Sequence, residues 1–73
     1  MNEKNRIEKD IIMFEENLLL LKDRNINKNQ QKTIELARQY YSDSKYYLGK
    51  NNYFTAFGCI NYAHGLLDAI IKF

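Results

Sequence analysis

Residues 53–71 read YFTAFGCINYAHGLLDAII and form the most apolar part of the chain, with Asp68 as their only charged residue. On a helix of about 3.6 residues per turn, the apolar side chains fill half of the circumference without a break. These positions are Tyr53, Ala56, Cys59, Ile60, Ala63, Leu66, Leu67, Ile70 and Ile71. A helix that is apolar around so much of its surface normally lies at the centre of a small domain. We therefore expect a central helix over residues 53–71, with Ile60, Ala63 and Leu67 buried.

Two amphipathic helices are predicted before it, over residues 3–24 and 29–48. In each, a line of residues recurs at steps of three and four, which places the line on one face. In the first helix this line is Ile7, Ile11, Phe14, Leu18 and Leu21. In the second it is Ile34, Ala37, Tyr41, Ser44 and Leu48. Short connections make neighbouring helices antiparallel. The sequence thus predicts one all-α domain over residues 1–73, an antiparallel three-helix bundle made of a helical hairpin plus an N-terminal helix.

The connections carry residues that end and begin helices. Residues 25–30, NINKNQ, are rich in asparagine, which favours turns and helix caps. Gly49 follows the second helix where a left-handed residue often ends one. Asn51 or Asn52 is then expected to cap the third helix.

The size and charge of the chain exclude little but set expectations. It has 73 residues, a net charge of +2 and one cysteine, so it forms no internal disulfide. The charged opening MNEKNRIEKD differs from a signal peptide, and the apolar run 18–21 is far shorter than the ~20 residues that span a bilayer. We expect a cytoplasmic protein that does not bind membranes. Tyrosines alternate with basic residues over 38–53, but the small basic excess argues against nucleic acid as the main partner.

Glycines inside the third helix need an explanation, because each costs about 1 kcal/mol relative to alanine. Gly58 and Gly65 are seven residues apart, and Ala69 continues their line. Such a stripe allows close approach of a neighbour. Packing within the chain, for example under a tyrosine of the second helix, is the favoured interpretation, and a dimer seam is the alternative. On the first helix, Ile12 and Leu19 form a second apolar line that is also a candidate contact surface.

Three polar residues of the third helix form a candidate site. His64 and Asp68 are four residues apart, and Asn61 lies three before the histidine, so all three are neighbours on the helix surface. An aspartate that orients a histidine suits acid–base chemistry or metal binding. However, Cys59 lies on another side of the helix and the set lacks a nucleophile. A hydrogen-bonding, structural role is therefore favoured. We predict no enzyme activity, no metal and no cofactor, and a buried, unreactive Cys59.

The second half of the chain resembles a known family. Three stretches show the resemblance: ARQYYSDSKYYL at residues 37–48, YFTAF at 53–57 and INYAHGLLDA at 60–69. Through these motifs, residues 35–70 resemble the short archaeal proteins catalogued as domain of unknown function 357. The resemblance implies a compact helical bundle in archaeal cytoplasm, and it brings no catalytic residue.

A second similarity is to the HEPN helical domains, which bind nucleotides and RNA. Asp43, Tyr46, Leu48, Tyr53 and Ala56 follow their helix-pair pattern. HEPN ribonucleases place an arginine four to six residues before a histidine. Positions 58–60, which precede His64 at that spacing, hold glycine, cysteine and isoleucine. This departure argues against nuclease activity.

Together these features predict a non-enzymatic interaction or assembly module. Its partner would be a second copy of the chain or another protein, because a bundle of this size leaves apolar residues uncovered. The alternative is a HEPN-like domain that binds a small ligand or RNA at Asn61, His64 and Asp68.

Overall fold

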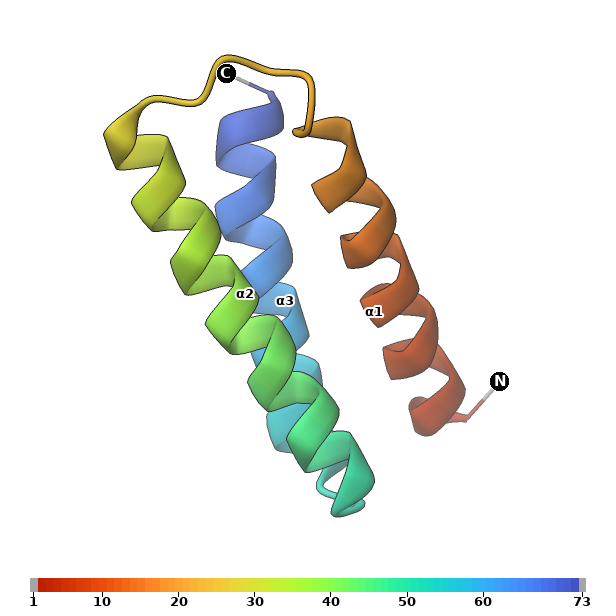
Figure 1. Ribbon diagram of the computed structural model, residues 1–73. Helices are drawn as coiled ribbons and strands as arrows, with labels where there is room; N and C mark the ends of the chain where they lie inside the picture. Colours follow the sequence, from red (N-terminus) through yellow and green to blue (C-terminus); the bar gives the residue numbers. More distant parts are fainter. Residues whose placement is uncertain (1, 73) are drawn as a thin grey trace.

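The computed structural model describes residues 2–72 and contains three helices. α1 spans Glu3–Leu20, α2 spans Lys28–Gly49 and α3 spans Tyr53–Ile71. α1 and α3 run in the same direction and α2 runs in the opposite one, so consecutive helices are antiparallel (Figure 1). The part of the chain that the structure describes contains no strand. The prediction of an all-α three-helix bundle is confirmed.

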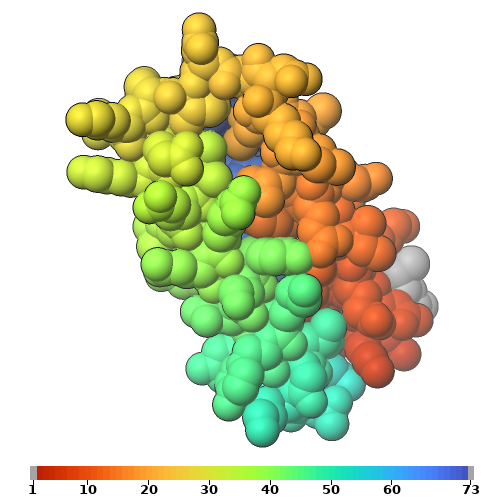
Figure 2. All heavy atoms as spheres, in the orientation of Figure 1, coloured from red at the N-terminus to blue at the C-terminus, as the bar shows by residue number. Residues whose placement is uncertain are grey.

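α3 is the hub of the bundle, as predicted. It packs against both other helices, and most extensively against α2. It contributes five buried residues: Ala56, Ile60, Ala63, Leu67 and Ile70. Viewed from the side of α1 and α2, the atoms of these two helices cover most of α3 (Figure 2). Because burial of one isoleucine or leucine contributes about 1.5–3 kcal/mol, this face of α3 holds much of the stabilising free energy.

α1 and α2 meet the hub with the faces that their periodicity predicts. α1 buries Ile7, Ile11 and Phe14, and α2 buries Ile34, Ala37 and Ser44. Ser44 is the one buried polar residue among positions 2–72. Its hydroxyl donates a hydrogen bond of 2.7 Å to the backbone carbonyl of Ala56 in α3. The bond satisfies the buried hydroxyl and fixes α2 against α3.

α1 ends earlier than predicted. The expected helix reached residue 24, but α1 stops at Leu20 and residues 21–24 form turns. The turns bring the Arg24 guanidinium to the C-terminal end of α3, where it donates hydrogen bonds to the carbonyls of Ile70 (3.4 Å) and Ile71 (3.1 Å). The last carbonyls of a helix lack partners within it and carry partial negative charge. The local pattern of α1 does not reveal this contact, whose partners lie 46 and 47 residues along the chain.

The turn between α2 and α3 differs from the prediction in one residue. Gly49 remains helical, and no glycine among the described residues has a positive φ. Asn51 instead adopts the left-handed conformation, with φ 62°. Asparagine tolerates this region better than most residues. The turn closes with a bond of 2.9 Å from the Asn52 amide to the Tyr47 carbonyl. The prediction of a left-handed Gly49 is therefore wrong by two positions.

Asparagines begin all three helices. Asn2, Asn27 and Asn52 each accept a hydrogen bond from the backbone amide three residues ahead. The Asn27 backbone amide in turn donates a hydrogen bond to the Gln30 side chain, and the two bonds form a capping box. The predicted caps at the two connections are confirmed.

Candidate functional site

The three polar residues of α3 do not form one site. His64 is half-buried and its Nε2 lies 2.7 Å from the backbone carbonyl of Asp10 in α1. A carbonyl only accepts hydrogen bonds, so Nε2 carries the proton. The ring also meets Phe14 edge-on, with 5.8 Å between the ring centroids. His64 therefore points at α1 and ties it to α3.

Asp68 and Asn61 face solvent instead. The Asp68 carboxylate lies 3.9 Å from the Lys72 ammonium, and both side chains are well exposed. Asn61 is exposed on the neighbouring turn. One cavity between α1 and α3 and two along α1 and α2 are lined by other residues. Among residues 2–72 no three histidine, cysteine, aspartate or glutamate side chains gather where they would hold a metal ion. The structure thus places these residues in separate surroundings, and the geometry offers no acid–base pair.

Cys59 is half-buried on the apolar side of α3, where burial raises the pKa of its thiol. The thiol is therefore protonated, and weakly nucleophilic, at neutral pH.

The glycine stripe is open to solvent. Gly58, Gly65 and Ala69 are all exposed, and a Cβ at either glycine would meet no atom within 4 Å. α2 contacts α3 on another side, where the Ser44 hydroxyl donates a hydrogen bond to the Ala56 carbonyl. The favoured prediction of tight packing within the chain is therefore wrong. The dimer-seam alternative stays a prediction.

A tyrosine of α2 does approach this region, but it lies beside the stripe. Tyr40 packs against Tyr62 with 4.5 Å between the ring centroids. Tyr62 itself remains 53% exposed. No ring from α2 therefore fills the space over the glycines.

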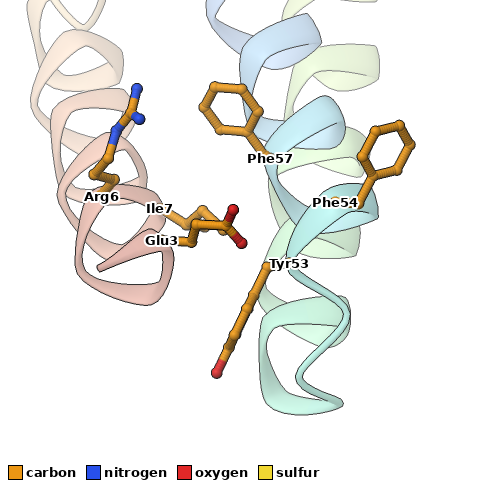
Figure 3. Close-up of a pocket in the computed structure, with 6 residues that line it drawn as sticks. All are labelled: Glu3, Arg6, Ile7, Tyr53, Phe54 and Phe57. Carbon is orange, nitrogen blue, oxygen red and sulfur yellow. The ribbon is translucent and has the colours of Figure 1, made fainter. Parts of the chain in front are cut away.

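Helical spacing places more exposed residues on the same side of α3. We call this surface the outer face. It consists of Phe54, Gly58, Asn61, Tyr62, Gly65 and Ala69, all of them exposed. Phe54 is 91% exposed, which is unusual for a phenylalanine. It points away from α1 (Figure 3). The apolar pattern of the sequence did not single out Phe54, although it lies four residues before Gly58 on the same side of the helix.

Apolar residues border the outer face on both sides. On α1, Met13 and Leu20 follow Arg6 at steps of seven, and Arg6 lies over the Phe57 ring of α3 at 5.7 Å. These two exposed residues therefore lie along the edge of α1 that adjoins α3. On α2, exposed Leu36 lies one turn before Tyr40. We call these two borders the rims.

A small aromatic cleft opens between the N-terminal ends of α1 and α3 (Figure 3). Its volume is about 150 Å³, and its lining consists of Glu3, Arg6, Ile7, Tyr53, Phe54 and Phe57. The Arg6 guanidinium lies over the Phe57 ring, a cation–π contact that closes one side. No motif in the sequence pointed to this cleft, because its residues come from two helices about 50 positions apart.

The second candidate surface of the sequence analysis lies on the far edge of α1. Ile12 and Leu19 are 55% and 60% exposed. Acidic residues lie near them, and one of these, Glu15, accepts a hydrogen bond from the Tyr41 hydroxyl of α2. That bond raises the pKa of Tyr41. This surface has more charged neighbours than the outer face of α3.

α3 is also long and apolar enough to cross a membrane, as the one such helix among residues 2–72. It has 19 residues and a mean hydropathy of 1.2 in its most apolar stretch, yet only 28% of that stretch is buried. Core helices of soluble proteins meet the same test of length and composition. The low buried share shows that the hub leaves much of its surface outside the bundle.

Comparison with known protein families assigns the chain to one of them. The model of a family described as "Protein of unknown function (DUF357)" matches residues 9–73, which include all of α2 and α3. The chain belongs to the DUF357 family. This confirms the resemblance of residues 35–70. No curated protein matches the chain. The similarity of this DUF357 member to HEPN helix pairs stays a prediction.

Proposed function

We propose that this DUF357 protein is a non-enzymatic interaction module of the archaeal cytoplasm, and that it binds a protein partner through the outer face of α3. The supporting observation is a concentration of exposed apolar side chains. Among residues 2–72, nine large hydrophobic side chains are exposed. Six of them lie on the outer face, on its rims or at its edge toward α1: Met13, Leu20, Leu36, Phe54, Phe57 and Tyr62.

Exposed apolar side chains that gather on one side of a small soluble protein mark interaction sites. Covering one phenylalanine ring stabilises a complex by about 1.5–3 kcal/mol before other costs. Exposed Tyr62 is also of a residue type that is enriched in binding hot spots. A bundle of this size has a thin margin of stability, so a partner adds to it by mass action.

The alternative of a ligand or RNA site at Asn61, His64 and Asp68 gains no support from the geometry. His64 bonds the Asp10 carbonyl of α1, Asp68 lies beside Lys72, and the cavities described between the helices are lined by other residues. We therefore place the function in the apolar surface and treat His64 as a contact between helices.

Photo-crosslinking in the native cells tests the proposal. Benzoylphenylalanine replaces Phe54 on the outer face, or Tyr46 on α2 as a matched control, since Tyr46 is also an exposed ring at 60%. We expect a discrete protein adduct from position 54 and none from position 46. Equal labelling at both positions, or no adduct at position 54, would overturn the proposal.

A further inference from the structure

Bulk is distributed unevenly along the outer face of α3. Its large exposed ring, Phe54, lies one residue into the helix, whereas Gly65 and Ala69 lie near the other end. Between them are Gly58 and the polar pair Asn61 and Tyr62. A partner that fits this face must therefore be slim opposite Phe54 and bulky opposite Ala69.

A second copy of α3 in the opposite direction has this profile. When two antiparallel α3 helices cross beside Asn61 and Tyr62, Phe54 of each faces Ala69 of the other. Gly58 then faces Gly65, so the two backbones approach closely at the crossing. A parallel pair would instead place ring against ring at one end and leave a void along the glycines. We propose that this protein forms a twofold dimer through the outer faces of two antiparallel α3 helices, which deepens the proposed function by naming its partner.

The charges of the face agree with self-association. Between Tyr53 and Leu67 the helix carries no formally charged residue. Asp68 and Lys72 are close enough to pair with each other. The two α3 helices therefore bring no like charges together at their crossing, and residues 53–67 offer no charge to an acidic or basic partner. Asn61 lies next to the proposed axis, where its amide can both donate and accept across the dimer.

The area of the surface is also sufficient. The principal-axis extents are 37 × 20 × 15 Å, so a broad side has a projected area of roughly 700 Å². Stable interfaces bury about 600–1,000 Å² per partner, so the broad side falls within this range. The rims, with Met13 and Leu20 on one side and Leu36 on the other, widen the contact beyond α3 itself.

The first test is the mass of the purified protein by sedimentation equilibrium at micromolar to millimolar concentration. We expect a dimer whose dissociation constant rises at least about tenfold in Gly65→Gln. The added side chain meets nothing within 4 Å in the single chain, so the helical content measured by circular dichroism should not fall. Gly49→Gln is the matched control, because Gly49 is equally unobstructed but belongs to α2. It should leave the dimer intact.

Disulfide trapping tests the direction of the helices. In a Cys59→Ala background, Asn61→Cys places two thiols near the axis and should give a covalent dimer under mild oxidation. Ala69→Cys should not, because the two copies of position 69 would lie about 22 Å apart along the antiparallel pair. Efficient trapping through Ala69→Cys would show a parallel pair and overturn the geometry.

The outcomes separate this inference from the proposed function. A wild-type protein that stays monomeric throughout the concentration range overturns the dimer. If position 54 still crosslinks to a different protein in cells, the interaction function stands without it. Co-sedimentation with phospholipid vesicles that Phe54→Ser abolishes, from a protein that is monomeric in solution, would assign the face to a membrane and overturn both.

Discussion

Replacing Gly65 with alanine should stabilise the isolated bundle. Gly65 lies inside α3, is exposed, and leaves open space where a Cβ would stand. The change therefore removes the glycine penalty of about 1 kcal/mol and introduces no clash. For a domain of 60–100 residues, 1 kcal/mol corresponds to a rise in Tm of about 4–8 °C. The glycine at this position is thus unfavourable for the monomer.

Urea unfolding followed by circular dichroism measures the effect. The protein must be dilute, below the dissociation constant of any dimer, because association would add to the apparent stability. A shift of the midpoint with an unchanged slope reports stability alone. Ala69→Gly is the reverse control on the same exposed line, and it should destabilise by a similar or smaller amount. If Gly65→Ala lost stability in dilute solution, a neighbour within the chain would have to fill that space, and the open stripe would be refuted.

Three further predictions concern contacts between helices. Ser44→Ala should destabilise the bundle by about 1 kcal/mol in urea, because it removes a buried hydrogen bond while the accepting carbonyl keeps a second lone pair. Arg24→Ala should cost about 0.5–1 kcal/mol and lower the protection of the last α3 amides in hydrogen exchange, whereas Arg24→Lys should restore only part of this. The bond from Tyr41 to Glu15 raises the Tyr41 pKa, so the folded state keeps a proton that the unfolded state loses above pH 10. The stability that this tyrosine contributes is complete below pH 10, and it falls as the pH rises through the raised pKa of Tyr41. Tyr41→Phe should therefore lose less unfolding free energy between pH 9 and pH 11 than the wild type, as measured by urea titrations.

The core could be predicted because burial imposes a period on the sequence. Ile60, Ala63 and Leu67 lie on one side of α3, and the pattern alone identified that side as the interior. The asparagine caps were predictable for a similar reason, since their chemistry is confined to three or four neighbouring residues.

Features that depend on distant partners were not predictable. The end of α1 is tied to Arg24, which bonds a carbonyl 46 residues away. His64 turns toward Asp10 of α1, and nothing local distinguishes that partner from Asp68, one turn along the same helix. The glycine stripe could be located from its spacing, but the sequence does not say whether a neighbouring helix also covers it.

Two residues of the outer face, Phe54 and Gly65, are unfavourable in a monomeric bundle. Phe54 is 91% exposed, so its ring adds almost nothing to the core and keeps apolar surface in water. A lysine or glutamate there would favour both the helix and solubility. Gly65 lowers helix stability in return for no packing within the chain. The exposed Phe54 ring adds too much apolar surface to a solvent-facing helix, and Gly65 adds too little side chain. Within one molecule, neither residue compensates for the other. In an antiparallel dimer both features are explained. Phe54 of each copy covers the end of the partner's α3 that has only small side chains, and Gly58 and Gly65 let the two helix backbones come close enough for this contact.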